Sequence, residues 1–246
     1  MALKKLLPLF FSIYTNILLG QTRAEASLIY NNASYDIYVI RIDTSSLKRF
    51  QFVENTSGTA HKGFIAQNGL FGKNTFCIKA CINDSSCSPL GLMVKDGNET
   101  HPLNLKDGTE NFYLKPNGVF AVSERRAFIT EASKFLLQKN IRLAVQSGPM
   151  LVVDNYLHPV FKADSKNKNF RSGVGVYQEN GAEYIVFAIS NTRVTFYDFA
   201  MLFWQKFHCK NALSLESAGC VMEIPFISRT NPADGSVICN YLVFEE

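Results

Sequence analysis

The chain has 246 residues, 47% of them hydrophobic, and its 25 Lys and Arg against 21 Asp and Glu give a formal net charge of +4. This small charge argues against a nucleic-acid partner, because binding a polyanion needs a clustered basic stripe. The densest basic segment, residues 162–171, also contains Asp164, Asn167 and Asn169, which indicates a solvated loop.

The amino terminus has the pattern of an export signal. Lys4 and Lys5 precede a mostly apolar stretch at residues 6–20, and a short polar segment then ends in Ala24-Glu25-Ala26. This pattern predicts a cleavable signal peptide over residues 1–26. The alternative, a retained membrane anchor, is disfavoured because a spanning helix needs about 20 apolar residues. We therefore expect an exported protein, periplasmic or secreted, with residues 27–246 as one domain and no membrane segment.

Strand patterns dominate that domain. Apolar and polar residues alternate over residues 35–42, which predicts a strand with one buried face. Similar apolar runs follow at residues 63–66, 90–94, 118–122, 141–145, 150–153, 174–177, 184–189 and 212–215. Turn-forming pairs at residues 96–97, 117–118, 154–155 and 180–181 separate several of these runs, so hairpins are expected.

Two segments have helical spacing. Residues 131–138 predict a short amphipathic helix, and residues 197–207 carry apolar side chains three and four positions apart, which predicts a largely buried helix. Thr195 and Asp198 resemble a capping box at its start. The predicted fold class is therefore α+β, a single domain of twisted, mostly antiparallel sheet around a buried helix.

The six cysteines are Cys77, Cys81, Cys87, Cys209, Cys220 and Cys239. An even number in an exported chain predicts that most of them form disulfide bonds. The sequence leaves the pairing open, with Cys239 and Cys209 both as partners for Cys220. The spacing of the first three does not match a zinc site.

No familiar catalytic signature occurs, such as a Gly-x-Ser-x-Gly elbow or a phosphate-binding loop. Instead, four segments place polar groups beside glycine at strand ends: residues 67–71, 146–149, 170–175 and 211–217. Two charged residues in them, Arg171 and Glu216, together suit a sugar phosphodiester. An arginine can hold two phosphate oxygens, and a carboxylate can act as acid, base or nucleophile at an anomeric carbon.

In order, these segments resemble the phosphodiester glycosidase family, and the bacterial branch most closely. The resemblance rests on short motifs spread over most of the chain, namely Asn68-Gly69-Leu70-Phe71, Pro89-Leu90-Gly91-Leu92, Gln146-Ser147-Gly148-Pro149, Leu157-His158-Pro159, Arg171-Ser172-Gly173-Val174-Gly175, Ala188-Ile189-Ser190 and Cys209-Lys210-Asn211-Ala212-Leu213. It implies a hydrolase that cleaves a sugar from a sugar-1-phosphodiester. It also implies that Arg171 and Glu216 lie in the active site.

The chain departs from the family pattern at two motifs. Asn68-Gly69-Leu70 stands for Asn-Gly-Gly, and Leu215-Glu216-Ser217-Ala218 stands for Leu-Asp-Gly-Gly. Glutamate reaches one methylene further than aspartate, and a Cβ replaces the open space of glycine. These changes favour an alternative function, a non-catalytic module that binds a glycan or phosphodiester on the same fold.

The resulting hypothesis assigns a role to each site residue. Glu216 and Arg171 are the catalytic residues, and the substrate-binding residues are Asn68, Gly69, Ser147, Gly148, Arg171, Ser172 and Gly173. We expect a sugar phosphodiester or glycan as substrate and no cofactor. Carboxylate and amide oxygens would suit a hard divalent cation, but no ligand set stands out.

Overall fold

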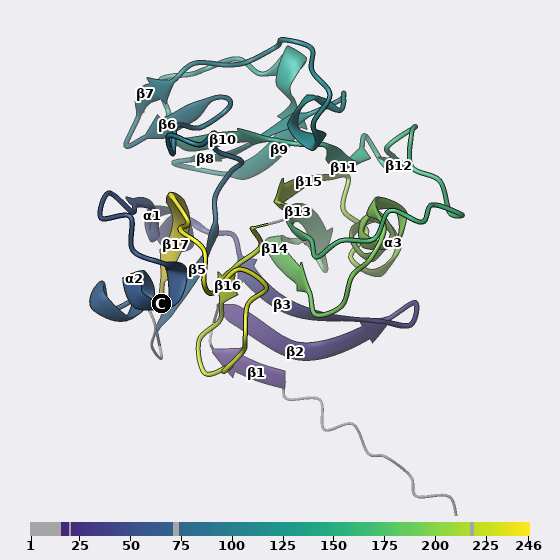
Figure 1. Ribbon diagram of the computed structural model, residues 1–246, viewed down its shortest axis with the longest axis horizontal. Coiled ribbons are helices and arrows are strands. Elements are labelled where there is room, and N and C mark those ends of the chain that lie inside the picture. The colour runs from purple at the N-terminus through teal and green to yellow at the C-terminus, as the bar shows by residue number, and fades with distance from the viewer. Residues whose placement is uncertain (1–15, 20, 71–73, 217–218) are drawn as a thin grey trace, which may run out of the picture.

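The structure is a computed structural model that describes residues 16–19, 21–70, 74–216 and 219–246. Most of the predicted signal peptide, residues 1–15 and 20, lies outside the described residues. The described part of the chain forms three β-sheets, and every strand pair in them is antiparallel. This arrangement, with a few short helices, confirms the predicted α+β class (Figure 1).

The largest sheet has eight strands. Their order across the sheet is β1 (Asn16–Leu19), β2 (Thr22–Tyr30), β3 (Ala33–Arg41), β14 (Ala182–Ser190), β13 (Ser172–Glu179), β15 (Asn211–Glu216), β11 (Met150–Val153) and β12 (Tyr156–Leu157). The hairpin turn from β13 to β14 passes through Asn180 and Gly181, both with positive φ, which the sequence pair predicts.

Two smaller sheets complete the domain. The five-stranded sheet has the order β7 (Asn98–His101), β6 (Met93–Lys95), β10 (Ile141–Ser147), β8 (Gly118–Ser123) and β9 (Ala127–Glu131). The four-stranded sheet has the order β16 (Met222–Glu223), β5 (Thr75–Lys79), β17 (Asn240–Glu245) and β4 (Phe50–Glu54).

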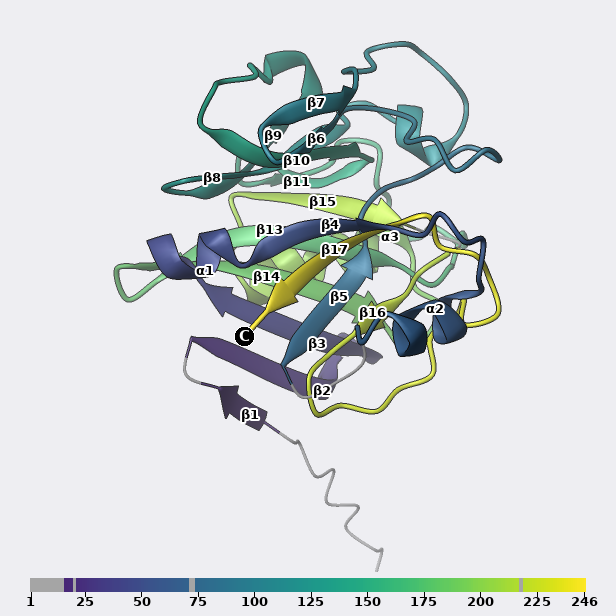
Figure 2. The same cartoon turned by 90° about the vertical axis from the view of Figure 1, so that its left-hand side faces the viewer.

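The inner faces of all three sheets enclose one apolar core. Figure 2 shows the five-stranded sheet at the top, above β15 and β13, with β4, β17 and β5 beside them. Phe187 of β14 meets Phe76 of β5 at a ring distance of 4.9 Å and Phe120 of β8 at 6.1 Å, so each sheet contributes an aromatic ring to this core. Burial of these rings holds the sheets together.

Helix α3 (Phe196–Met201) covers the other face of the eight-stranded sheet and continues as a π-helical turn at Leu202–Lys206. The predicted buried helix and its cap are confirmed, since the Asp198 amide donates to Thr195 Oγ1 at 3.0 Å. Glycine lets this helix approach β13 closely. A Cβ on Gly173 would lie 3.1 Å from the Phe199 ring, and one on Gly175 would lie 2.7 Å from the Phe203 ring.

Two of the predicted elements are wrong. Residues 63–66 lie in helix α2 (His61–Gln67), whose Phe64 and Ile65 pack on the four-stranded sheet. An apolar run this short does not distinguish a strand from one buried helix face. Residues 131–138 are not an amphipathic helix: Glu131 ends β9, a 3-10 turn follows at Ala132–Lys134, and the chain is then extended. A further short helix, α1 (Thr44–Lys48), was not predicted.

The strand predictions agree better with the structure. Residues 35–42, 118–122, 141–145, 150–153, 174–177, 184–189 and 212–215 coincide with β3, β8, β10, β11, β13, β14 and β15. Only the end of the run at residues 90–94 is a strand, β6. The sequence did not predict the remaining strands, namely β1, β2, β4, β5, β7, β9, β12, β16 and β17, so it missed the whole four-stranded sheet.

The cysteines are mostly unpaired, contrary to the sequence prediction. One disulfide bond joins Cys87 to Cys239, across 152 residues of sequence, and ties the loop after β5 to the start of β17. Cys77, Cys81, Cys209 and Cys220 are free and buried, so Cys220 has neither of its two predicted partners. Burial raises the pKa of the Cys81 thiol to about 12, which keeps it protonated and unreactive.

Thiol counting checks this correction. We expect no rapid reaction of a thiol reagent with the native protein, because all four free thiols are buried. Under denaturing, non-reducing conditions, four thiols should react, and six after reduction. A denatured count of two or fewer would contradict the single disulfide bond.

The predicted cleavage site, between Ala26 and Ser27, falls inside β2. Ala24 is fully buried, and the Ser27 amide donates to Asp36 Oδ1 at 2.8 Å. Cleavage there would remove the pairs that residues 22–25 make with β3 and turn the Ser27 amide into an ammonium beside the Asp36 carboxylate. No helix in the described part of the chain has the length and apolar character needed to cross a bilayer.

Mass spectrometry of the exported protein tests the predicted processing. We expect Ser27 as the first residue, because Ala24 and Ala26 supply the small residues of the cleavage site. An amino terminus at or before Thr22 would instead leave β2 whole and contradict the predicted site. Detection of Met1 on exported protein would reject cleavage altogether.

Candidate functional site

Four neighbouring strands of the eight-stranded sheet share one row of paired residues. Asp36 of β3 pairs with Ile189 of β14, Ile189 pairs with Ser172 of β13, and Ser172 pairs with Glu216 of β15. Residues paired across strands point to the same face of a sheet. Since Ile189 belongs to the central core, the three polar residues lie on the core-facing side of the sheet.

A β-bulge gives Glu216 its direction. Gly173 pairs with Ser214, but the next residue back, Ser172, pairs with Glu216, so Leu215 is the extra residue. A bulge of this kind shifts the alternation of side chains and re-aims the residue after it. Ser147, at the end of β10, fixes the bulge, because its hydroxyl donates to the Leu215 carbonyl at 3.1 Å.

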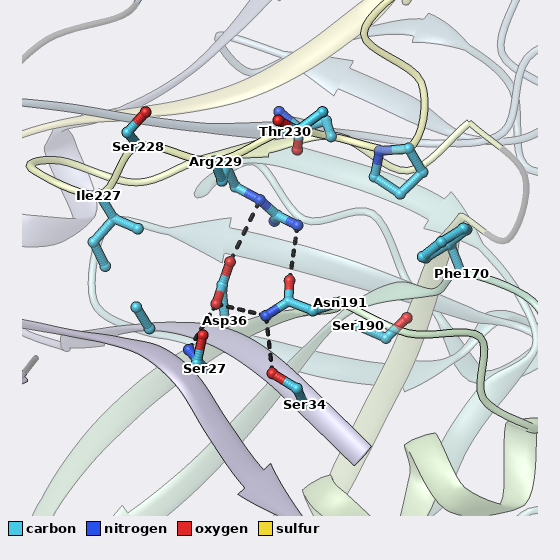
Figure 3. A pocket seen from close by; sticks show the side chains of 13 residues that line it. Ser27, Ser34, Asp36, Phe170, Ser190, Asn191, Ile227, Ser228, Arg229 and Thr230 are labelled. Atoms are coloured by element: carbon cyan, nitrogen blue, oxygen red, sulfur yellow. Dashed lines mark hydrogen bonds and ion pairs between the residues drawn. The ribbon is translucent and has the colours of Figure 1, made fainter. Parts of the chain in front are cut away.

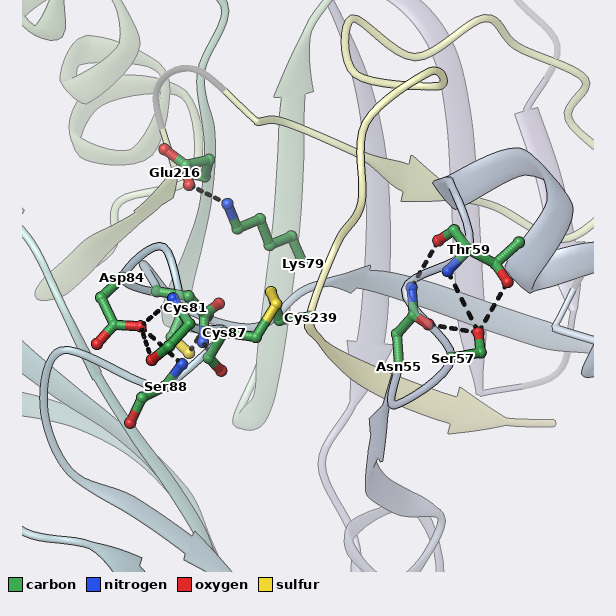
Figure 4. The surroundings of a disulfide bond; sticks show 12 residues. Asn55, Ser57, Thr59, Lys79, Cys81, Asp84, Cys87, Ser88, Glu216 and Cys239 are labelled. Atoms are coloured by element: carbon green, nitrogen blue, oxygen red, sulfur yellow. Dashed lines mark hydrogen bonds and ion pairs between the residues drawn. A yellow bond between two sulfur atoms is a disulfide. The ribbon is translucent and has the colours of Figure 1, made fainter.

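The Glu216 carboxylate forms an ion pair with Lys79 Nζ, from the last residue of β5 (Figure 4). Both side chains are largely buried, with 9% and 12% of their surface exposed. Gly219 lies against this pair: a Cβ there would be 2.9 Å from Lys79 Nζ. An ion pair stabilises the charged form of a carboxylate, so Glu216 presents a negative charge next to an ammonium group.

Cys220 lies beside the same carboxylate, and its thiol donates to the Glu216 carbonyl at 3.4 Å. Burial, and then the charge of Glu216, raise the pKa of this thiol to about 12, although Ser172, Lys79 and Arg171 act in the opposite direction. The thiol is therefore protonated at neutral pH. This argues against Cys220 as a nucleophile.

Arg171 directly precedes β13 and lies under helix α3. Its Nε donates to the Val194 carbonyl at 3.0 Å and its Nη2 to the Asn167 carbonyl at 3.2 Å, while the guanidinium carbon lies 3.4 Å from the centre of the Phe196 ring. Burial lowers the pKa of Arg171 to about 10, and Cys220 and Asp198 partly oppose this shift. The side chain thus stays charged at neutral pH while it braces the loop before β13.

Gly148 and Gly173 are packed tightly. A Cβ on Gly148 would lie 2.7 Å from Asn117 Cβ, and one on Gly173 would lie 2.8 Å from the Leu213 carbonyl. Both glycines therefore allow close packing of strands at this end of the sheet. The structure places them, with Ser147 and Ser172, around the segment that presents Glu216.

Asn68 and Gly69 lie elsewhere, at the carboxyl end of α2. The Asn68 side chain donates to the Phe64 carbonyl at 2.9 Å, and Gly69 has a φ of +66°. Both are exposed. Within the part of the chain that the structure describes, we find no contact of either with Arg171 or Glu216.

A cavity of about 500 Å³ lies at the other end of the paired row (Figure 3). Asp36 lines it, together with Phe170 and Ser190, whose hydroxyl accepts from the Arg171 amide at 2.9 Å. Arg229 lies beside Asp36 in the lining of the cavity, with its Nε 3.4 Å from Asp36 Oδ2.

Sequence reasoning did not identify Lys79, Asp36, Asn191 or Arg229. In the sequence, Lys79 is marked only by its position directly after the apolar run 76–78. Asp36 is one of the polar residues in the alternating segment 35–42. Neither pattern distinguishes a site residue from a solvated one. Each becomes a candidate because strands distant in sequence bring it beside another charge.

A second polar cluster joins α2 to β16. His61 Nε2 lies 3.0 Å from Glu223 Oε1 and 3.9 Å from Asp234 Oδ1, and the ligand atoms of the three residues lie within 4.8 Å of one another. A histidine with two carboxylates could hold a divalent cation. However, His61 Nδ1 also lies 2.9 Å from the Tyr241 hydroxyl. Both ring nitrogens of His61 thus have protein partners. These bonds give the cluster a structural role, the attachment of α2 to β16 and β17.

Comparison with known proteins identifies the family. Residues 53–222 match the phosphodiester glycosidase family. The chain is 32% identical over 181 residues to the uncharacterized protein YigE of Escherichia coli (strain K12). This alignment covers 73% of the chain and 70% of YigE. The fold also resembles the crystal structure of a hypothetical protein from Synechocystis, with a TM-score of 0.54 and 12% sequence identity. The match covers 92% of this chain and 62% of the other, and it concerns the fold alone. Because the family match covers more than half of its residues, the chain belongs to the phosphodiester glycosidase family.

Proposed function

We propose that the protein hydrolyses a sugar-1-phosphodiester, with Glu216 as the group that acts at the anomeric carbon. One observation carries the proposal: the bulge at Leu215 turns Glu216 onto the face that it shares with Ser172 and Asp36, and Lys79 holds its carboxylate there. The family motif has an acidic residue at this position. The other family motifs at Ser147, Arg171 and Gly173 surround the same strand end.

The leaving group explains how one carboxylate can be sufficient. Glycosidases that expel an alcohol use two carboxyl groups, one of which protonates the departing oxygen. A phosphate ester is a much weaker base, since the second pKa of phosphate is about 6, and it departs without that proton. Glu216 would then accept a proton from water as the water oxygen bonds to the anomeric carbon. The bond from that carbon to the phosphate oxygen breaks, which yields free sugar and a phosphomonoester.

The positive charges of the site would favour an anionic substrate. Lys79 lies beside Glu216, and the buried Arg171 keeps its charge close to Cys220. Two nitrogens of Arg171 already donate to backbone carbonyls, so we assign it an electrostatic and bracing role rather than a two-pronged grip on phosphate. Lys79 is better placed to contact the phosphate. Asn68 and Gly69 lie at the carboxyl end of α2, so they would contact the substrate only if it extends that far.

A product assay tests the proposal. The exported protein is incubated with a panel of sugar-1-phosphodiesters, and the released phosphomonoester is measured with a phosphatase-coupled assay. Release from at least one substrate, abolished by boiling the protein and absent when only the coupling phosphatase is present, is the expected result. If no substrate is turned over at any pH between 4 and 9, the hydrolase proposal fails.

The second candidate is a binding module without turnover. The observation that favours it is that the longer Glu216 side chain forms an ion pair with Lys79, which occupies the carboxylate that a catalyst would need free to react. This candidate predicts saturable binding of a phosphodiester with no product released. The disulfide bond between Cys87 and Cys239 supports export in either case, because such bonds persist in oxidising compartments.

A further inference from the structure

We infer that the cavity between β3, β14 and residues 227–232 is a subsite for a neutral sugar ring of the substrate. This inference extends the proposed function and rests on it. Two buried charges define the cavity: the side chains of Arg229 and Asp36 are only 5% and 6% exposed. They form an ion pair, so their two charges offset each other, and cleavage before Ser27 would add its ammonium as a further donor to Asp36 (Figure 3).

The polar groups of this subsite are held in position before any ligand binds. Asn191 donates to Asp36 Oδ1 at 2.8 Å and accepts from Arg229 Nη2 at 3.1 Å, which links the two charged side chains. The Ser27 amide and the Ser34 hydroxyl brace Asp36 and Asn191 from the other side. Pre-positioned groups of this kind lower the entropic cost of binding.

Arg229 also has an unused donor. Its Nη1 is buried and has no hydrogen-bond partner among the described residues. A buried donor without a partner is costly, which indicates that a ligand or water completes the site. Because the side chain is more than nine-tenths buried and lines the cavity, the ligand would meet this donor inside the cavity.

The chemistry of the lining favours a sugar over an ion. The Asp36 carboxylate would repel an anion, and the Arg229 guanidinium would repel a cation. A hydroxyl group can accept from Arg229 and donate to Asp36 at the same time, and a sugar carries several such groups. Phe170, Ile227 and Pro232 add apolar surface for the C–H face of the ring. A volume of about 500 Å³ lies within the range of small-molecule sites.

The subsite lies in line with Glu216. Asp36 and Glu216 occupy the same paired row, three strand spacings apart, which corresponds to roughly 14 Å between their backbones. Both side chains extend from that row on the same, core-facing side of the sheet. At that distance, the ring in the cavity is not the sugar whose anomeric carbon meets Glu216, but a further sugar ring of the same substrate on the other side of the phosphodiester.

Saturation-transfer NMR with methyl glycosides of glucose, galactose, mannose and N-acetylglucosamine tests the subsite directly, because these probes carry no phosphate. We expect the exported protein to bind at least one of them at millimolar concentration. Thr230→Trp, at the exposed rim, should block the cavity, and Arg229→Lys should weaken binding about tenfold, which is the effect expected for a lost charged hydrogen bond. Gln138→Trp, at an exposed position in the loop before β10, is the matched control and should bind normally.

The outcomes separate this inference from the proposed function. Glycoside binding without turnover supports the subsite and counts against the hydrolase. Turnover without glycoside binding, or glycoside binding unaffected by Thr230→Trp, overturns the subsite and leaves the hydrolase standing. Inorganic phosphate that displaces the glycoside in wild type but not in Arg229→Lys would identify an anion site and also overturn it.

Discussion

Glu216→Gln is expected to lower the turnover of a sugar-1-phosphodiester by roughly 10²- to 10⁴-fold, with little change in substrate affinity. Glutamine keeps the shape of the side chain but cannot take a proton from water. Lys79 can still donate to the amide oxygen of Gln, so the fold should be retained at a cost in stability. Steady-state kinetics with the substrate found in the product assay provides the measurement.

Two further variants sharpen this test. Glu245→Gln changes an exposed carboxylate at the end of β17 and should leave turnover unchanged. Glu216→Asp shortens the side chain that departs from the family pattern. A shift of about 1 Å in a catalytic atom can cost on the order of 10²-fold, so this variant should lose activity if the site is adapted to glutamate. Full wild-type turnover in Glu216→Gln would exclude the residue from the chemistry.

Arg171→Ala is expected to lower the free energy of unfolding by about 3 kcal/mol, since two carbonyls lose a donor and the contact with Phe196 disappears. For a domain of this size, that loss corresponds to a fall in Tm of about 6–12 °C. Thermal unfolding followed by circular dichroism gives the measurement. Arg125→Ala, at an exposed position before β9, should leave Tm unchanged.

The same series distinguishes bracing from phosphate recognition. Arg171→Lys keeps the charge but loses the planar contacts, so we expect it to remain destabilised while it binds a phosphodiester nearly as well as wild type. If Arg171→Lys had wild-type Tm but failed to bind a phosphodiester, the planar guanidinium of Arg171 would contact the phosphate rather than brace the loop. Because the pKa of Arg171 is lowered only to about 10, its charge is constant from acid to neutral pH. Any pH dependence of turnover in that range must therefore come from another group.

The sequence alone determined the family, the central strands of the two larger sheets and the buried helix, but no strand of the four-stranded sheet. Residues 150–153 and 184–189 are continuous apolar runs, which suit strands buried on both faces, and residues 197–207 repeat at helical spacing. These patterns depend only on neighbouring residues, so they can be recognised without knowledge of the fold. The motifs around Ser147, Arg171 and Glu216 likewise indicated one strand end, and the structure places them together there.

Tertiary structure decided which groups meet at that end. Lys79 reaches Glu216 only because β5 lies beside the end of β15, and Arg229 reaches Asp36 only because residues 227–232 fold back over β3 and β14. The bulge at Leu215 and the pairing of Cys87 with Cys239 also depend on register between distant segments. Local periodicity carries no information on such register, since it is set by the packing of whole sheets against a shared core.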